Sequence, residues 1–383
     1  MQRGIVGLLA MASACGFAAR SNPAESPGGP RDAAVDVPPV DGNDAMASSR
    51  RRKTITFDHN RIAATLTDFP AWIDLTDGDI AARAQPDGSD IYFTASDGAT
   101  RLDYELQAVD VAAHHFSAWV RIPTLDGTVA TVVHVEYGDR GAAPGPRPAG
   151  VFKSSYAAVW HLDDALPVTT IADATGLHAG TPVLTAATTT AAGKLGRGLA
   201  FTAAQNDRIE FTNPLTGDNP HTISVWVNQA ANLNHTAAIV VMGTPTTGNA
   251  RWLHGHYTNS SVAIGYFNLD SVPSPAQVID GANWTQLTWV FEGNNRKNRL
   301  YRNGVEVPPQ FLPGPNPAIN TTGTAGFIGY APMPAYGGNN AYDGTIDELR
   351  IATTARSAEW VATEYANQSS PSTFYAVGPE LVP

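Results

Sequence analysis

The sequence predicts an all-β protein that carries more than one folded domain. Turn-forming residues are abundant, with 35 glycines and 28 prolines, and they separate many short runs in which apolar and polar residues alternate. Alternation with a period of two is typical of half-buried β-strands, and long helical patterns are few. At 383 residues the chain is too long for one ordinary hydrophobic core, so two domains and flexible tails are expected.

Net charge and cysteine content exclude some functions. The formal net charge of −11 leaves no basic face to neutralise phosphates, so nucleic acid is not an expected partner. The basic run Arg50, Arg51, Arg52 and Lys53 lies in a polar segment and is interpreted as a solvated linker. The single cysteine, Cys15, permits no intrachain disulfide, and domains of this size can be stable through apolar burial alone.

The first fifteen residues resemble a bacterial lipoprotein signal peptide. Arg3 gives a positive start, Ile5 to Ala12 form an apolar run too short to span a bilayer, and small residues precede Cys15. The resemblance implies that Cys15 is lipidated and that the protein is exported to the outer membrane or cell surface, held by its lipid anchor. The alternative is an ordinary signal peptide that is cleaved nearby, with Cys15 discarded.

Residues 16–53 are predicted to be a disordered tether. They are rich in Pro, Gly, Ser, Ala and Asp and contain almost no large apolar side chain. Such a segment cannot bury enough surface to offset the entropy lost on ordering.

Residues 54–150 are predicted to form a small antiparallel β-sandwich domain. Alternating runs are separated by turn signals such as Asp97-Gly98 and Asp126-Gly127. Five motifs in order resemble the bacterial family catalogued as domain of unknown function 2341. These motifs are DFPAWIDL (68–75), DIYFTASDG (90–98), LDYELQAVD (102–110), SAWVRIPTL (117–125) and VHVEYGD (133–139).

Two groups in this domain could suggest catalysis or metal binding. Asp90, Asp103 and Glu105 offer carboxylates, and paired carboxylates can share acid and base roles. Asp103 and Glu105 are two apart on a predicted strand, which is also the pattern of a solvated strand face. His114 and His115 point to opposite faces of a strand, so they cannot chelate one ion together. Structural roles are expected for both groups.

Residues 151–383 carry an ordered series of motifs that resembles the laminin-G-like branch of the concanavalin A-like jelly rolls. Asn303-Gly304 lies between two short apolar runs, a strong hairpin signal, and apolar runs such as ISVWV are suited to a sandwich core. The motifs are AVWHLDD (158–164), DATGLHAGT (173–181), GKLGRGLAF (193–201), HTISVWVNQ (221–229), NWTQLTWVFEG (283–293), LYRNGVEV (300–307), GFIGY (326–330) and YDGTIDELRIATTARS (342–357).

The last of these motifs predicts a closing strand followed by a helix. Ile346 and the run Leu349–Ile351 indicate a strand, and Gly344 before it indicates a tight turn or a close backbone approach. Ser357 can cap a helix that carries Glu359 in its first turn. The resemblance implies that the first and last strands of this domain lie close together in one sheet.

Motifs for hydrolytic enzymes are missing from this domain. The retaining glucanases of this superfold carry a Glu-x-Asp-x-x-Glu strand, which the sequence lacks, and adjacent Asp347 and Glu348 are expected to point to opposite faces of their strand. No Gly-x-Ser-x-Gly motif occurs. His254 and His256 have the spacing of metal ligands on one strand face, but no third ligand is evident nearby, so zinc is not favoured.

Calcium is the favoured metal hypothesis. Oxygen ligands on loops suit calcium, and resemblance to laminin-G-like domains implies Asp173 and Asp347 as ligands. Asp163, Asp207 and Asp343 are weaker candidates. The alternative is that these acidic side chains cap turns and accept hydrogen bonds from backbone amides.

Aromatic side chains can form a platform for the apolar face of a sugar ring. Trp160, Trp226, Trp284 and Trp289 lie in apolar strand patterns and are expected in the core. The tryptophan and tyrosines in turn-like stretches are expected to be exposed and are candidates for ligand binding: Trp252, Tyr257, Tyr266 and Tyr336.

Three functions follow from these patterns. The first is a surface-tethered, non-enzymatic recognition or adhesion protein that binds a glycan or a cell-surface protein through the laminin-G-like domain. The second is a carbohydrate-active enzyme, a glycosidase or lyase, with a site on the concave face of the sandwich. The third is a purely structural envelope component.

Overall fold

The structure is a computed structural model. It describes residues 50–383 except 140, 142–144, 154, 186–187, 231–235, 245–249, 256–260, 267–268, 274–278, 280–282, 294–297, 308, 312–319 and 333–339. The predicted signal peptide, Cys15 and nearly all of the predicted tether therefore lie outside the described residues. In the described part of the chain, no helix combines the length and the apolar character needed to span a membrane.

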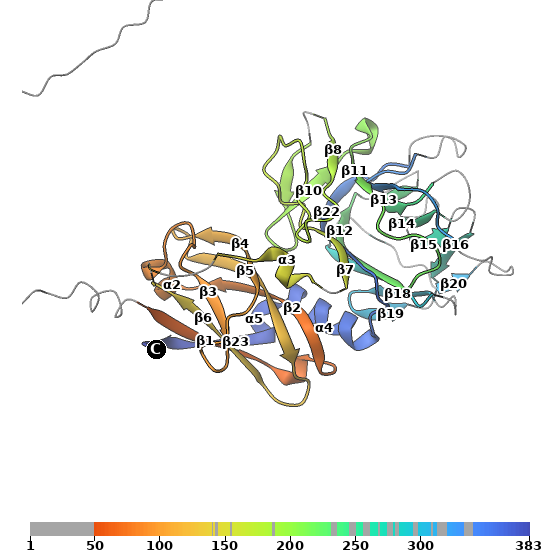
Figure 1. Ribbon diagram of the computed structural model, residues 1–383. Coiled ribbons are helices and arrows are strands. Elements are labelled where there is room, and N and C mark those ends of the chain that lie inside the picture. Colours follow the sequence, from red (N-terminus) through yellow and green to blue (C-terminus); the bar gives the residue numbers. More distant parts are fainter. Residues whose placement is uncertain are drawn as a thin grey trace, which may run out of the picture. The chain divides into compact units, whose positions relative to one another are not determined.

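The first folded domain consists of two antiparallel sheets around one core (Figure 1). One sheet has the strand order β23-β1-β6-β3 and the other the order β2-β5-β4. The bounds are β1 Arg51–Phe57, β2 Leu66–Thr76, β3 Tyr92–Ala95, β4 Tyr104–Asp110, β5 His115–Leu125, β6 Thr131–Tyr137 and β23 Tyr375–Leu381, with the short helices η1 His59–Arg61 and α2 Gly78–Arg83. The alternating runs of the sequence form these strands, which confirms the predicted antiparallel β-sandwich.

The second domain is a sandwich of two eight-stranded sheets, as the jelly-roll resemblance implies. The first sheet contains β7 Tyr156–Trp160, β9 Thr190–Ala192, β10 Arg197–Phe201, β12 His221–Gln229, β17 Thr285–Phe291, β18 Asn298–Arg302, β19 Val305–Val307 and β22 Gly344–Ala352. The second contains β8 Thr181–Val183, β11 Arg208–Thr212, β13 Ala237–Met242, β14 Arg251–Gly255, β15 Val262–Tyr266, β16 Leu269–Pro273, β20 Pro309–Phe311 and β21 Ala325–Ile328. The short helices α3 Pro148–Val151 and η2 Ala203–Gln205 lie between strands in the sequence.

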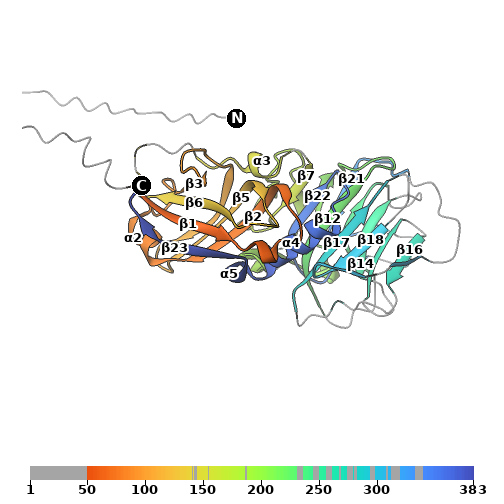
Figure 2. The same ribbon diagram turned by 90° about the horizontal axis from the view of Figure 1, so that it is seen from below.

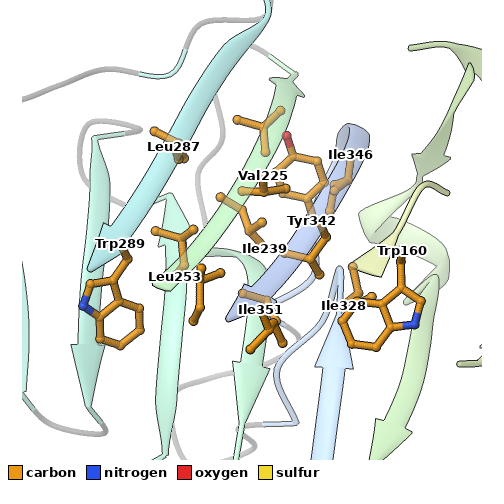
Figure 3. Packing of buried hydrophobic residues seen from close by; sticks show 14 of the residues in the cluster. Trp160, Val225, Ile239, Leu253, Leu287, Trp289, Ile328, Tyr342, Ile346 and Ile351 are labelled. Atoms are coloured by element: carbon orange, nitrogen blue, oxygen red, sulfur yellow. The ribbon is translucent and has the colours of Figure 1, made fainter. Parts of the chain in front are cut away.

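The core of the second domain is built from the facing sides of these two sheets (Figure 3). Val225, Leu287 and Ile351 come from the first sheet, and Ile239 and Leu253 come from the second. All five side chains are at most 1 % exposed. Burial of each such side chain contributes roughly 1.5–3 kcal/mol, so this core supplies most of the stability of the domain.

The closing strand-helix unit forms as predicted. β22 pairs with both β12 and β7, so the first and last strands of the sandwich lie side by side. Gly344, at φ 137°, leaves no room for a side chain, because a Cβ would lie 2.3 Å from the carbonyl oxygen of Asn228. Helix α4, Ala358–Ser369, begins after Ser357, whose hydroxyl accepts a hydrogen bond from Trp360 N–H.

The chain does not end in the second domain, and this corrects the predicted boundary at residue 383. After α4 and the short helix α5, Pro371–Phe374, strand β23 pairs antiparallel with β1 and completes the first sheet of the first domain (Figure 2). Phe374 and Tyr375 are buried in the first core, next to Phe57 at ring-centroid distances of 6.0 and 5.8 Å. The apolar surface of these rings explains why the segment leaves the sandwich.

The basic run is part of the fold, so its interpretation as a solvated linker is wrong. Residues 51–53 belong to β1. Arg50 and Arg52 both contact the fully buried carboxylate of Glu136, at 3.1 and 2.5 Å. Lys53 is 6 % exposed and its ammonium lies 2.5 Å from Asp77. The guanidinium groups are needed here because a buried carboxylate is stable only when it is paired.

The returning strand generates a stability prediction. Replacing Phe374, which is 0 % exposed, by Ala should lower the free energy of unfolding by about 3–5 kcal/mol, because it opens a cavity in the first core. The measurement is a urea titration followed by near-ultraviolet circular dichroism. The matched control is Val382→Ala, at a side chain that is 72 % exposed, which should change stability by less than about 0.5 kcal/mol. Equal stabilities of the two variants would refute the assignment of this segment to the core.

Candidate functional site

A groove lined by ionisable side chains lies where the two domains meet. Its volume is about 430 Å³. One wall comes from β4 and α3 and the other from the segment that follows β7. The lining residues are Glu105, Leu106, Gln107, Pro148, Ala149, His161, Asp163, Ala172, Asp173, Ala174 and Gly176. We call it the junction groove.

His161 contacts acidic side chains from both domains. Its Nδ1 lies 2.8 Å from Glu348 Oε1 and its Nε2 lies 3.3 Å from Glu105 Oε2. The ring also stacks on Trp119 of β5, with centroids 6.1 Å apart and planes 14° from parallel. The next residue, Leu162, has φ 62° and is buried in the sandwich core. A non-glycine residue in this left-handed region costs free energy, and here it turns the chain directly after His161.

Asp347 and Glu348 share one face of β22, which corrects the prediction that they point to opposite faces. Ile346, Leu349 and Ile351 lie in the core. In a regular strand, core-facing residues are two apart, but Ile346 and Leu349 are three apart, so one extra residue lies between them. The pairing of β22 with β12 shifts register at this point, and Glu348 has φ 53°. A β-bulge of this kind re-aims side chains. Both carboxylates therefore lie away from the core.

Glu348 is held by cations on two sides. Besides His161 it contacts Arg350, 2.8 Å away, and both Glu348 and Arg350 have side chains only 1 % exposed. The guanidinium of Arg350 lies 4.0 Å from the ring centroid of Trp119. This arrangement joins β22 of the second domain to β5 of the first. His161, Glu348 and Arg350 each have a partner of opposite charge, as burial of charged groups requires.

The pKa values around His161 follow from this pairing. Burial acts to lower the pKa of His161, but the charges of Glu348 and Glu105 outweigh it and raise the pKa well above its usual value. Burial acts to raise the pKa of Glu348, yet His161 and Arg350 bring it below normal. Burial, together with the neighbouring charge of Glu348, raises the pKa of Asp347 well above normal. The group thus holds a charged imidazolium at neutral pH.

The junction contains residues that sequence reasoning missed. His161 was not singled out, and Glu105 was expected to have only a structural role. The residues that meet here are 56 and 187 positions from His161 in the sequence. No local spacing signals such a contact, and the only available hint is that His161 stands next to an acidic pair in the motif AVWHLDD.

The two favoured calcium ligands both accept hydrogen bonds from backbone amides, although Oδ1 of Asp347 is buried and has no hydrogen-bond partner among the described residues. Asp173 accepts hydrogen bonds from the backbone N–H groups of Val159, Thr175, Leu177 and His178. Donor hydrogens directed at a carboxylate occupy the positions that a cation would need. Oδ2 of Asp347 likewise accepts from two backbone amides, of Lys194 and Leu195. These hydrogen bonds occupy most of the carboxylate oxygens of the two residues, and calcium binding by them stays a prediction.

The weaker metal candidates are also dispersed. Asp207 accepts hydrogen bonds from the N–H groups of Thr185 and Thr202, and Asp163 accepts one from Gln107. The backbone carbonyl of Asp343 accepts from the N–H of Ala230. Among the described residues, no group of three or more His, Cys, Asp or Glu side chains is placed to hold a metal ion.

The other polar candidates have structural partners. Asp90 is 1 % exposed and accepts from the N–H groups of Gln85 and Gly138. Asp103 pairs with Arg121 and Arg147. His115 lies 2.7 Å from Asp74, and His114, at φ 55°, lies in the turn before β5. His254 is 0 % exposed, and His256 lies outside the described residues.

The tryptophans predicted to be in the core are confirmed except for one. Trp160, Trp226 and Trp289 are at most 2 % exposed, whereas Trp284 is half-buried. Trp252 is only 7 % exposed, so the expectation that it is exposed is wrong. It packs with Ala238, Val241 and Ala331 and stacks on His254 at 3.8 Å. Burial of its large ring against these neighbours explains the difference.

The side chains of the three tyrosine candidates for ligand binding are not among those that the structure describes. Tyr257 and Tyr336 lie outside the described residues, and the side chain of Tyr266 is not described. The backbone of Tyr266, in β15, pairs with that of Arg251, in β14.

The sheet that carries Trp252 has a continuous row of residues on its outer face. Glu210, Phe327, Val241, Trp252 and Gly265 are directly opposite one another on five neighbouring strands. Paired residues share a face, and the adjacent row (Ile209, Ile328, Val240, Leu253 and Ile264) lies in the core. We call the first set the outer row.

One end of the outer row is partly exposed to solvent and combines aromatic with charged side chains. Phe327 and Tyr330 are half-buried, with ring centroids 6.2 Å apart. Arg208 lies 5.2 Å from the ring of Tyr330 and 2.8 Å from Glu210. Aromatic rings beside charged hydrogen-bonding groups are the composition of many polar-ligand sites.

The raised pKa of His161 generates a pH prediction. A group whose pKa is raised by folding contributes stability that is fully present below its unfolded value, about 6.5, and that is lost as pH rises through the folded value. The difference in unfolding free energy between the wild type and His161→Gln should therefore be largest at about pH 6 and shrink toward alkaline pH. Chemical denaturation across that range measures it. His59→Gln, on the surface helix η1, serves as the control, and a parallel pH dependence of the wild type and His161→Gln would contradict the pairing.

Comparison with known proteins agrees with this architecture. Residues 87–162 match the family model described as domain of unknown function (DUF2341). Residues 203–362 match the family model described as concanavalin A-like lectin/glucanases superfamily. The first match includes Glu105 and His161, and the second includes Glu348, so the junction group combines residues of both. No curated protein matches the chain.

Several solved structures share a partial likeness. Domain 4 of AbnA, a GH43 extracellular arabinanase from Geobacillus stearothermophilus, in complex with arabinotriose, is 22 % identical over 56 % of this chain and 100 % of its own, with a TM-score of 0.40. The botulinum neurotoxin type G receptor-binding domain is 13 % identical over 56 % of this chain and 52 % of its own, with a TM-score of 0.37. Trypanosoma rangeli sialidase in complex with the inhibitor DANA is 10 % identical over 69 % of this chain and 42 % of its own, with a TM-score of 0.39.

The family matches, the order of the motifs and the two-sheet sandwich agree with one another. The chain carries a DUF2341 segment followed by a domain of the concanavalin A-like lectin/glucanase superfamily.

Proposed function

We propose that this protein is a surface-tethered, non-enzymatic recognition protein that binds glycans through its concanavalin A-like domain. The observation that carries the proposal is the accessible end of the outer row, where Phe327 and Tyr330 lie beside Arg208 and Glu210. A sugar ring offers one apolar face to an aromatic ring and hydroxyls to charged neighbours, so this combination suits a glycan. The superfamily to which the domain belongs includes lectins by its description.

Binding without catalysis is supported by the state of the acidic groups at the junction. Glu348 is engaged by His161 and Arg350, and Glu105 is engaged by His161. Carboxylates committed to ion pairs are stabilised in their charged form, whereas a general acid must hold a proton near neutral pH.

One observation favours the alternative of a carbohydrate-active enzyme. Burial raises the pKa of Asp163 in the junction groove, which is the direction required of a general acid. Glu105 is the second carboxylate of the groove. Release of reducing ends from any polysaccharide, lost in Asp163→Asn, would establish this alternative and displace the recognition proposal.

Tethering at the cell surface is a proposal that comes from the sequence. Residues 1–15 have the pattern of a lipoprotein signal, and Cys15 is the single cysteine of the chain. β1 and β23 are adjacent antiparallel strands, with Arg52 opposite Leu381.

The glycan proposal is tested on an array with residues 50–383. Phe327→Ala should reduce binding to the preferred glycan by about tenfold, in line with the loss of one aromatic contact. Val305→Ala is the matched control, because that side chain is 68 % exposed on β19 of the other sheet and should not affect binding. Absence of binding on a broad array, with capture of a protein ligand instead, would overturn the glycan assignment.

Calcium dependence is measured in the same assay by adding a chelator. Since Asp173 and Asp347 accept backbone hydrogen bonds, we expect glycan binding to survive chelation. Loss of binding on chelation, restored by added calcium, would support the calcium hypothesis drawn from the resemblance.

The anchor proposal is tested in cells. Cys15→Ser should move the protein from the membrane fraction to the soluble fraction, because two or more acyl chains are needed for lasting attachment. Fractionation followed by immunoblotting measures the change, with Ser13→Ala as the control. Wild-type protein found entirely in the soluble fraction after export would contradict lipidation.

A further inference from the structure

The junction groove has the size and the walls of a ligand site. Its volume of about 430 Å³ is within the range of small-molecule sites, roughly 300–1,000 Å³. One wall belongs to the first domain and the other to the second, and junctions of this kind are frequent ligand positions. Small residues (Ala149, Ala172, Ala174 and Gly176) form the apolar part of its surface and leave space for a ring.

Its polar lining offers mainly acceptors. Glu105 uses Oε2 toward His161, and Asp163 uses Oδ2 to accept from Gln107. Their other carboxylate oxygens accept no hydrogen bond in the described part of the chain. Oε1 of Gln107 is shut off from solvent and has no hydrogen-bond donor among the described residues. Because this oxygen is closed to solvent, the acceptors that a ligand can reach are the carboxylates of Glu105 and Asp163.

The polar side chains of the groove come from two irregular stretches of backbone. Gln107 is the extra residue of a β-bulge between β4 and β5, since Leu106 pairs with Ala118 and Ala108 with Ser117. Leu162, whose φ angle is positive, separates His161 from Asp163. Gln107, His161 and Asp163 all line the groove. Residues two apart on a strand share a face, so Glu105 and Gln107 both line the groove.

The charges in the lining favour a cation. Glu105 and Asp163 contribute negative charge, and Asp173 adds a third carboxylate that is already saturated by N–H donors. His161 is the single lining cation, and it is shared between Glu105 and the buried Glu348. A net negative groove attracts a positively charged ligand and repels an anionic one.

We propose that the junction groove binds an amino sugar, with its protonated amine between Glu105 and Asp163 and its hydroxyls donating to the remaining acceptors. A hexosamine carries several donors spaced around a ring, which matches several acceptors spaced around a groove. A lysine side chain presents one donor group on an apolar stem and would leave the further carboxylate oxygens of the groove without donors. An N-acetylated sugar lacks the charge. This site is distinct from the outer row, since the two share no residue.

The test uses residues 50–383 and the β-1,4-linked glucosamine trimer at pH 6, with binding measured by calorimetry. The trimer should bind more tightly than its N-acetylated counterpart and than trilysine, and its affinity should fall with added salt. Asp163→Asn should weaken binding about fivefold, the upper end for one accessible ion pair. Ala149→Trp should abolish binding, because Ala149 is exposed and its replacement fills the groove.

Matched variants separate this proposal from the others. Ala99→Trp, at an exposed position outside the groove, should bind the trimer like the wild type. Phe327→Ala should also bind it normally, so failure of the outer-row proposal would leave this result unaffected. Unchanged affinity in Ala149→Trp, or equal affinity for the N-acetylated trimer, would overturn the proposal. Tighter binding of trilysine would overturn it in favour of a basic peptide.

Discussion

The structure depends on the burial of Glu348 between His161 and Arg350. The side chain of Glu348 is 1 % exposed, and an unpaired carboxylate in such a place is not stable. Loss of one partner from a buried ion pair costs about 3–5 kcal/mol. Both cations that pair with this carboxylate also contact the first domain, because His161 contacts Glu105 and the guanidinium of Arg350 lies over Trp119.

Helix α4 makes a second, neutral connection with the same effect. Asn367 donates to and accepts from the backbone of Trp72 in the first domain, at 2.9 and 2.6 Å. Gln368 accepts from the indole of Trp226 in the second domain at 2.6 Å. Adjacent residues of one helix therefore bond to different domains. Trp360 of this helix packs in the first core, whereas its neighbour Val361 packs with Val290 and Tyr301 of the second domain.

This coupling bears on function. A ligand in the junction groove touches β4 of one domain and the segment after β7 of the other, so it favours the arrangement in which both are close. The outer row, in contrast, lies within one sheet of the second domain. The protein thus has one candidate surface that depends on a single domain and one that requires both.

The sequence by itself determined the local structure of this protein. Alternation with a period of two predicted the strands. Asn303 and Gly304 form a hairpin turn because both adopt positive φ angles. Ser357 caps the start of α4. These features depend on neighbours within a few residues, and the motif order also pointed to the two families. Gly344, the first residue of β22, makes the close backbone approach that was predicted for it.

Only the tertiary structure decided where the chain closes and what its charged residues do. β23 pairs with β1 across more than three hundred positions, and the partners of His161 are 56 and 187 positions away. The bulge at Glu348 occurs where the partner of β22 changes from β10 to β7, which no alternation pattern records. Burial of Trp252 and pairing of Arg52 likewise depend on surfaces contributed by distant strands. Long-range packing, not local propensity, sets the energies of these groups.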